Sequence, residues 1–431
     1  KYPLPKSDFK WIKPEDVNKI QYTEVSENSE TGYILEVDLE YGQHLHDLHA
    51  DYPLAPVKQT ITEDMLSPYS KMLQKKLGFG ESTNQKLLTT LEDKKNYVLH
   101  YLNLKQYVQL GMKVTKIHRV LTFKQSPWLA PFIDFNTEKR KESTTQFGKD
   151  FFKLVNNAIY GKSLENKRSR VDFKLVLCEQ QLTKWAASPR LKSMIIYNKN
   201  IVGLSLKQQT ITLDKPIYVG FTILEISKTI MYNFHYNWAK AKYGNNIRLC
   251  MTDTDSLLYH VRTADLYKDI FQDLHLFDTS DYPETHFCHS AQNKKKLGVF
   301  KDESNGEAIR EFIGLRAKCY SILQHDKQEK KVAKGVLRSA IKKQLRHDLY
   351  RQCLFNQVPK MTTGMTIRST HHQLFTKKLC KLSLSPFDDK RYILDDGVNT
   401  LPYGHYKINK KKRELVEEEE DLSQPSTSSK R

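Results

Sequence analysis

Two short apolar runs flank a polar stretch that reads Met251-Thr252-Asp253-Thr254-Asp255-Ser256. The runs, at 247–251 and 257–261, are rich in strand-forming residues, so the sequence predicts a β-hairpin with two aspartates at its tip. Two carboxylates separated by one residue on a rigid turn suit hard divalent cations such as Mg²⁺. Two-metal phosphoryl transfer uses such ions to contact both the attacking and the leaving oxygen. An ordinary acidic surface turn has the same local signature, so other features must decide between these readings.

The composition indicates a basic chain that is large enough for two or three domains. Lys and Arg number 69 against 50 Asp and Glu, giving a net charge of +19 across 431 residues. Such an excess is typical of proteins that bind a polyanion, and the 23 Tyr and 19 Phe provide surfaces on which bases can stack. The six cysteines have no zinc-ribbon or redox spacing, and no signal peptide or long apolar run is present. We therefore expect an intracellular protein with reduced thiols and no membrane partner.

A second group of candidate residues belongs to a helix that we expect over residues 136–160, followed by a glycine cap. The group contains Lys141, Lys153, Asn157, Tyr160 and the capping Gly161. Spacings of four and three place the last three side chains before the glycine on one helical face, and Lys141, twelve residues before Lys153, can share it. Such a face could hold a triphosphate by charge and a nucleoside by contact with the tyrosine. An amphipathic helix with a glycine cap is the alternative.

The remaining patterns predict an α+β protein. We expect strands at 33–41, 114–123 and within 297–323 with a turn at Asn305-Gly306, a strand and helix over 94–111, and helices over 224–242 and 332–354. The helix ending near Gly244 leads directly into the acidic hairpin. The basic run Lys410-Lys411-Lys412-Arg413 precedes an acidic and Ser-rich tail that we expect to be disordered. That run fits a nuclear import signal and a plain solvated charge run equally well.

Together, the helix and the hairpin resemble motifs B and C of the family B DNA polymerases. The residues, their order and their spacing all match: K-x-x-x-N-x-x-Y-G in the helix, followed by Asp-Thr-Asp-Ser in the hairpin. Within this family the chain most resembles the protein-primed branch found in viruses, linear plasmids and transposons of the Polinton (Maverick) kind. Further stretches that fit are Glu36-Val-Asp-Leu-Glu-Tyr41, Leu45-His-Asp-Leu-His49, Asp51-Tyr-Pro-Leu-Ala-Pro56, Asn166, 388–392 and 403–405. The resemblance covers residues 1–406.

The resemblance implies a role for each candidate side chain. Asp255 would bind two catalytic Mg²⁺ ions, which Mn²⁺ could replace, and Asp253 would be a weaker partner. Lys153, with Lys141 beside it, would contact the phosphates of an incoming dNTP. Asn157, Tyr160 and Gly161 would line the nascent base pair and the DNA. Ala158 stands where motif B often has Ser, and Met251 where motif C often begins with Tyr.

A third family element, K-x-Y, is matched by Lys318-Cys319-Tyr320. The resemblance implies that this element holds the primer strand. Alternation along a predicted strand would place Arg316, Lys318 and Tyr320 on one face, where cations and an aromatic ring could position the DNA backbone. An edge strand that is protected by charge is the alternative.

The family's motif A, written Asp-x-x-x-Leu-Tyr-Gly or Asp-x-x-Ser-Leu-Tyr-Pro, is missing from the sequence. Asp38 in Glu36-Val-Asp-Leu-Glu-Tyr41 is a superficial candidate for its aspartate, but the family carries a similar element downstream of motif A. Since the chain starts at Lys1 rather than Met, we expect a fragment that begins just after motif A. The family's amino-terminal 3′–5′ exonuclease domain is likewise absent from this sequence.

The resemblance implies a right-hand architecture with an antiparallel palm sheet, helical fingers and a thumb. Its expected parts are 1–135 (palm segment with an insertion), 136–165 (fingers helix), 166–296 (palm with the hairpin), 297–406 (thumb) and 407–431 (charged tail). We expect a DNA-templated DNA polymerase that adds dNTPs to a primer 3′-hydroxyl, or to a terminal priming protein, in viral or transposon replication. The alternative is an inactive or co-opted transposon-derived DNA-binding protein. A nucleotide-sugar glycosyltransferase is disfavoured, because it gives neither the helix nor the +19 charge a role.

Overall fold

The computed structural model describes residues 2–370 and 373–411, which belong to two compact units. Unit 1 comprises residues up to 128, residues 225–361 and those from 382 onward; unit 2 comprises 129–224 and 362–381. No helix in the described residues is long and apolar enough to cross a membrane. The expected disordered tail over 407–431 is wrong for 407–411, which are helical with Ile408 in a buried cluster, and the rest of the tail and half of the predicted basic run lie outside the described residues.

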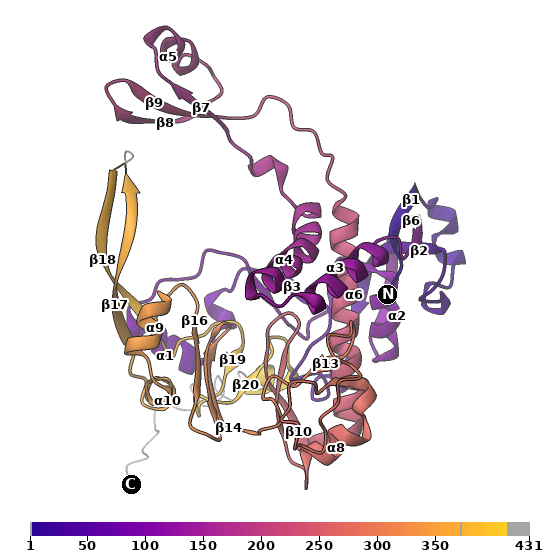
Figure 1. The fold of residues 1–431 in the computed structure, drawn as a ribbon. Coiled ribbons are helices and arrows are strands. Elements are labelled where there is room, and N and C mark those ends of the chain that lie inside the picture. The colour runs from indigo at the N-terminus through magenta and orange to yellow at the C-terminus, as the bar shows by residue number, and fades with distance from the viewer. Residues whose placement is uncertain (1, 371–372, 412–431) are drawn as a thin grey trace, which may run out of the picture. The chain divides into compact units, whose positions relative to one another are not determined.

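Unit 1 contains a four-stranded antiparallel sheet in the order β1-β6-β2-β5 (Figure 1). Its strands are β1 (Leu4–Trp11), β2 (Thr31–Glu40), β5 (Lys94–His100) and β6 (Lys113–Ser126). The apolar side chains Leu35, Val37 and Leu39 of β2 alternate along the strand and are fully buried. Helix α2 (Tyr101–Gln109) follows β5 directly. The chain turns away after the helix at Gly111, which has a positive φ of 101°. The strands and the helix predicted for these segments are confirmed.

A long helical run in unit 1 leads into the hairpin. It consists of α6 (Ile217–Tyr232), a π-helical segment (Asn233–Lys240) and α7 (Ala241–Tyr243), and it ends at Gly244 with φ 54°. The predicted end is confirmed, whereas the start lies at Ile217 rather than at 224. The wider π-helical turn lets three consecutive residues, Phe234, His235 and Tyr236, all be buried. The unit boundary falls inside α6.

The later part of unit 1 is a second antiparallel sheet backed by helices. It contains β14 (Ile309–Arg316), β15 (Cys319–Gln324) and β16 (Glu329–Ala333), with α9 (Arg338–Gln344) and α10 (His347–Phe355). Ile313, Leu315, Cys319 and Tyr350 form its core. The turn expected at Asn305-Gly306 is confirmed by φ angles of 55° and 88°. The single helix expected over 332–354 is wrong: β16 occupies its first positions, and the rest forms two helices that begin at Arg338 and His347.

Shorter elements complete unit 1. They are β3 (Val57–Gln59), α1 (Pro68–Leu77), β4 (Lys86–Leu88), α8 (Leu266–Gln272), β12 (Phe277–Asp278), β13 (Phe300–Lys301), β19 (Tyr392–Ile393) and β20 (Thr400–Leu401). The last two strands return to the amino-terminal part of the unit, where Tyr392 and Tyr403 pack against Leu88 and Ile61. Residues near both ends of the sequence therefore share one core.

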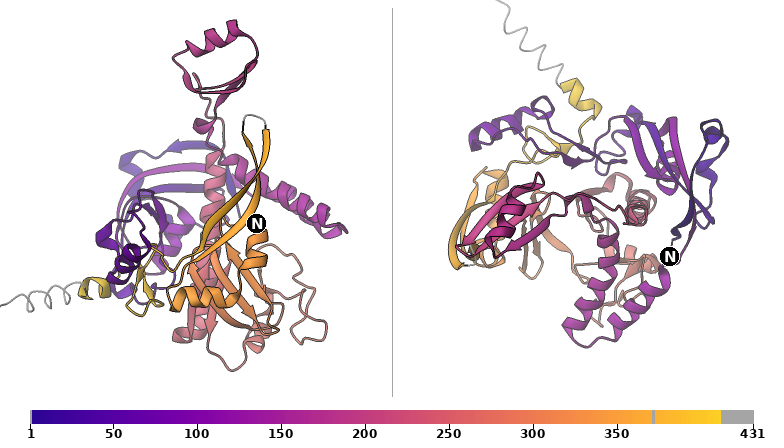
Figure 2. Two further views of the ribbon diagram at one scale, coloured as in Figure 1. Left: turned by 90° about the vertical axis from the view of Figure 1, so that its left-hand side faces the viewer. Right: turned by 90° about the horizontal axis from the view of Figure 1, so that it is seen from above.

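Unit 2 begins with two helices, α3 (Ala130–Glu142) and α4 (Gln146–Ser163), which pack against each other (Figure 2). A single helix over 136–160 is therefore wrong. The chain breaks at Ser143, and Thr145 caps α4 by accepting a hydrogen bond from the Gly148 N–H at 3.1 Å. Helix α4 runs through Gly161 to Ser163, so the predicted glycine cap is also wrong.

The rest of unit 2 consists of β-structure with one helix. A three-stranded sheet contains β7 (Asp172–Val176), β8 (Leu191–Asn198) and β9 (Ile201–Leu206), and α5 (Glu179–Ala186) packs against it. A long hairpin is formed by β17 (Lys360–Thr370) and β18 (Gln373–Leu384).

Candidate functional site

The acidic turn lies at the tip of a two-stranded hairpin in unit 1. Strands β10 (Ile247–Thr252) and β11 (Leu257–Val261) are antiparallel, and Thr252 pairs with Leu257, which leaves residues 253–256 as the connection. Thr254 has a left-handed φ of 63°, and the Asp253 N–H donates to the Ser256 carbonyl at 3.1 Å. Asp255 is exposed and Asp253 is half-buried. The predicted hairpin, with both carboxylates at its tip, is confirmed.

A second hairpin tip meets the acidic turn. The Lys318 Nζ lies 2.7 Å from both carboxylate oxygens of Asp253, although 65 residues separate the two in the sequence. The pair carries opposite charges in a geometry that satisfies both oxygens. The structure thus joins the Asp-Thr-Asp-Ser and K-x-Y elements by a direct contact within unit 1.

The placement of Lys318 corrects the sequence prediction. Arg316 pairs with Cys319, so Ala317 and Lys318 form a two-residue turn between β14 and β15, and Lys318 has a φ of 59°. Alternation along one strand therefore does not place Arg316, Lys318 and Tyr320 on one face. Arg316 and Tyr320 instead lie on two adjacent strands, away from the buried Leu315 and Cys319. The Tyr320 ring packs against the Phe312 ring, and the two ring centroids lie 6.0 Å apart.

Asp38 belongs to a cross-strand ladder of ion pairs. Its Oδ1 accepts hydrogen bonds from the Asn96 N–H at 2.8 Å and from His118 Nε2 at 2.9 Å. The hydrogen bonds from Asn96 and His118, in that order, are the main causes that lower the pKa of Asp38. The other two acids that alternate along β2 also have basic partners, Glu36 with Arg119 and Glu40 with Lys113.

Asp38 is therefore a structural carboxylate in this fold. No group of three or more His, Cys, Asp or Glu side chains is placed to hold a metal ion within residues 2–370 and 373–411. Asp38 thus does not complete a ligand set with Asp253 and Asp255.

The motif B residues lie in unit 2. Lys153, Asn157 and Tyr160 all belong to α4, as predicted, and the first two are exposed. Partial burial raises the pKa of the Tyr160 hydroxyl. Lys141, however, belongs to α3, where its Nζ lies 2.8 Å from Glu138 Oε1. The prediction that Lys141 and Lys153 share one helical face is wrong, because the chain breaks between them.

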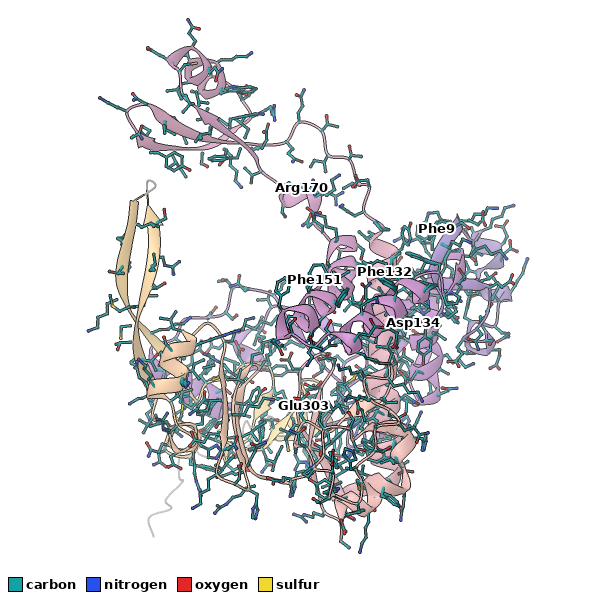
Figure 3. All side chains as sticks on the ribbon, viewed as in Figure 1. Phe9, Phe132, Asp134, Phe151, Arg170 and Glu303 are labelled. Carbon is teal, nitrogen blue, oxygen red and sulfur yellow. The ribbon has the colours of Figure 1, made fainter. Side chains whose placement is uncertain are left out.

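Gly161 occupies an open position in α4. Apart from its chain neighbours and the backbone of its own helical turns, no described atom lies within 4 Å of a Cβ built on this residue. Apolar rings are exposed on the same pair of helices: Figure 3 labels Phe132 on α3 and Phe151 on α4, which are 42% and 48% exposed. The α4 surface thus combines exposed Lys, Asn and aromatic side chains with an unobstructed glycine.

One residue near the hairpin was missed as a candidate. Asp51 Oδ2 accepts a hydrogen bond from the Leu249 N–H of β10 at 3.1 Å. Asp51 belongs to the stretch 51–56, which resembles the family, but the resemblance assigned no role to this aspartate. Only the packing of this loop beside β10 connects it to the acidic turn.

Comparisons with known proteins support the fold. No protein-family model and no curated protein matches the chain. Among solved structures, phi29 DNA polymerase in a ternary complex with primer-template DNA and incoming nucleotide matches with a TM-score of 0.52 and 14% identity, covering 88% of this chain and 55% of that chain. Its post-translocation binary complex with primer-template DNA matches with a TM-score of 0.50 and 15% identity, covering 88% and 54%.

The chain spans about half the length of these polymerases. At this level of identity the match concerns the fold rather than the activity. The resemblance to protein-primed family B DNA polymerases, found first in the motifs, now has a counterpart in three dimensions. This chain has a mixed helix and sheet structure that shares the fold of phi29 DNA polymerase.

Proposed function

We propose that this chain is the palm, fingers and thumb part of a DNA-templated DNA polymerase of the protein-primed family B. It would transfer dNTPs to a primer 3′-hydroxyl, or to a terminal priming protein, in the replication of a viral or transposon DNA. The observation that carries the proposal is the contact between Lys318 and Asp253. That contact brings two sequence-distant motifs together within a fold shared with a DNA polymerase.

In this proposal the hairpin is the metal-binding part of the palm. The oxygen ligands of Asp253 and Asp255 have the chemistry that Mg²⁺ prefers. Asp253 is engaged by Lys318, and no described side chain pairs with the Asp255 carboxylate, so Asp255 is the more available of the two. When bound, Mg²⁺ or Mn²⁺ would favour the ionised 3′-hydroxyl and balance the charge of the leaving pyrophosphate. Two carboxylates supply only part of an octahedral ligand set, so other oxygens must complete it.

The chain's own residues would bind and orient the substrates. Lys318 and Arg316 would hold primer phosphates, which positions the strand without reading its sequence. On α4, Lys153 would contact the triphosphate, with Lys141 of α3 as a further cation, while Asn157 and Tyr160 would line the base pair. The open surface at Gly161 would let DNA approach the helix backbone closely.

The test is Mg²⁺-dependent dNTP incorporation by the full-length chain on a primed template. We expect Asp255→Asn to abolish incorporation while DNA affinity stays within about twofold, because the aspartate contributes to chemistry rather than to DNA binding. Glu303→Gln is the matched control, since Glu303 is an exposed acid of unit 1 (Figure 3) and should leave incorporation unchanged. Retained synthesis in Asp255→Asn would refute the metal assignment.

A DNA-binding protein without polymerase activity is the second candidate, favoured by the net charge of +19. It predicts binding that weakens steeply with salt, as for any protein that neutralises phosphates with Lys and Arg. Salt-dependent binding by a wild-type chain that incorporates no nucleotide would favour this candidate. Absence of DNA binding would contradict both candidate functions.

A further inference from the structure

The acidic hairpin is supported by a loop that carries two consecutive residues, Asp51 and Tyr52. Among the strands of residues 2–370 and 373–411, β10 pairs with β11 alone, so its other edge would leave backbone N–H groups unpaired. The Asp51 carboxylate satisfies one of them by accepting from the Leu249 N–H at 3.1 Å, and its second oxygen lies 3.8 Å from Arg248 Nε. A charged acceptor on a backbone donor makes a stronger hydrogen bond than a neutral one.

Tyr52 anchors the loop that carries Asp51. Its backbone carbonyl accepts a hydrogen bond from the Tyr236 hydroxyl at 2.5 Å. The Tyr52 ring is only 8% exposed and packs against Tyr232 at 4.6 Å and edge-on against His235 at 5.4 Å. Asp51 thus holds β10 close to the acidic turn, and Tyr52 fixes the loop of Asp51 to the buried aromatic cluster.

The partner strand is held by the same aromatic cluster. His235 Nδ1 lies 3.0 Å from the Tyr259 hydroxyl, and the two rings stack with an interplanar angle of 7°. Tyr259 is the residue that pairs with Leu249 across the hairpin. Both strands are therefore linked to the π-helical segment, β11 through Tyr259 and β10 through the loop that carries Asp51 and Tyr52.

The loop that carries Asp51 is in turn fastened by the end of the described chain. Arg391 donates from one guanidinium nitrogen to the Ala50 carbonyl at 2.9 Å and from another to Thr400 Oγ1 at 2.8 Å. The Tyr406 N–H donates to His46 Nδ1 at 3.1 Å. These contacts join two regions that are far apart in the sequence, the one that contains 45–49 and 51–56 and the one that contains 388–392 and 403–405.

We propose that Asp51 and Tyr52 are positioning residues that set the place of the Asp253 and Asp255 carboxylates, with Arg391 fixing them from the carboxy-terminal segment. The inference rests on the proposed function only where it concerns catalysis. Ligand groups must be held within about 0.5 Å, and a displacement of about 1 Å can cost on the order of a hundredfold in rate. A two-stranded hairpin is marginally stable by itself, so an external support is what makes such precision attainable.

Hydrogen exchange of the full-length protein tests the support directly. Asp51→Ala removes the acceptor at Leu249, and Tyr52→Leu removes the ring that packs against Tyr232 and His235. We expect Asp51→Ala to speed exchange of the amides at 249–258 by about tenfold, the effect of losing one hydrogen bond, and Tyr52→Leu to speed it as well. Tyr282→Phe is the matched control, because its hydroxyl bonds Asp302 at 2.7 Å elsewhere in unit 1. Hairpin exchange no faster than in the control overturns the proposal.

Two more measurements separate positioning from general loss of structure. Asp51→Asn keeps an acceptor oxygen and should restore most of the protection lost in Asp51→Ala. In incorporation assays, Asp51→Ala should lower kcat about tenfold or more, with the KM for dNTP and the DNA affinity within about twofold. An unchanged kcat would overturn the claim that this support of the hairpin contributes to catalysis. If the wild-type chain incorporates nothing, the proposed function fails, and the exchange measurement still decides whether the hairpin is held in this way.

Discussion

The contact between Lys318 and Asp253 is suited to orientation rather than to stability. The two side chains are 48% and 35% exposed, and ion pairs at that exposure contribute only about 0–1 kcal/mol to folding. Such a pair can be exchanged at little cost for a phosphate on the lysine and a cation on the aspartate. The residue pair that identifies the site is therefore also the part of it that is easiest to rearrange.

Replacing Lys318 by Met should weaken DNA binding without unfolding the protein. We expect about tenfold weaker binding to primed DNA and a salt-dependence slope reduced by about one, the signature of a lost phosphate contact. Stability should change by less than about 1 kcal/mol. Fluorescence anisotropy across a salt series measures both binding quantities.

Lys268→Met is the control for this change. Lys268 is 74% exposed in unit 1 and makes a weak pair with Asp265 at 3.7 Å, so its loss should leave DNA affinity nearly constant. Equal effects of the two substitutions would mean that Lys318 acts only through net charge.

At the scale of elements, helix α4 contains a glycine that no steric contact with the rest of the described structure requires. Gly161 lies inside the helix with free space around it. A helical glycine costs about 0.5–1 kcal/mol relative to alanine, so its presence without an internal steric reason fits a surface kept clear for a ligand. Stability and function should therefore respond to its replacement in opposite directions.

Gly161→Ala should stabilise the protein by about 0.5–1 kcal/mol and reduce DNA binding several-fold. Urea unfolding and DNA titration of the same preparation check the two effects. Gly220→Ala provides the contrast, because its methyl would come within 2.4 Å of Leu164 Cγ and should destabilise the protein. Unchanged DNA binding in Gly161→Ala would remove this residue from the proposed DNA surface.

At the scale of the whole molecule, buried histidines link stability to pH. Burial lowers the pKa of His49, His100 and His235 to about 3, and their Nε2 atoms have no hydrogen-bond partner in the described structure. The unfolded chain binds protons at these sites below about pH 6.5, whereas the folded chain does not. Their stabilising contribution is complete above pH 6.5 and is lost as the pH falls toward 3.

We expect each of these histidines to cost about 1.4 kcal/mol at pH 5.5 relative to neutral pH. In His100→Asn, the drop in unfolding free energy between pH 7.5 and 5.5 should be smaller by that amount. The asparagine can still accept the Leu102 N–H that His100 accepts as the cap of α2. His325→Asn, at an exposed position between β15 and β16, should leave the pH dependence as it is. Identical slopes in both variants would contradict the assignment.

The sequence by itself determined the local elements of this protein. Residues 253–256 are polar between two apolar runs, and such a pattern specifies a hairpin without help from the rest of the chain. Positive φ at Asn305 and Gly306, and the helix stop at Gly244, likewise follow from the residue types. The order and spacing of the motifs predicted the fold that the comparison with phi29 DNA polymerase supports.

Some errors came from local alternatives of similar energy. Lys318 could have continued a strand, yet it forms a turn. A short break at Ser143 separates Lys141 from Lys153, because a capping threonine two residues later competes with helix continuation. Side-chain pattern alone does not decide between such choices.

The tertiary structure alone decided what each carboxylate does. Asp38, Asp51 and Asp253 are the same residue type close to strands, but they meet a histidine and a backbone amide, a strand edge, and a lysine, respectively. These partners come from segments 58 to 198 residues away, and no local pattern encodes which of them will be near. The reason is physical: the pairing depends on how sheets and helices pack to bury their apolar faces, which is a property of the whole chain.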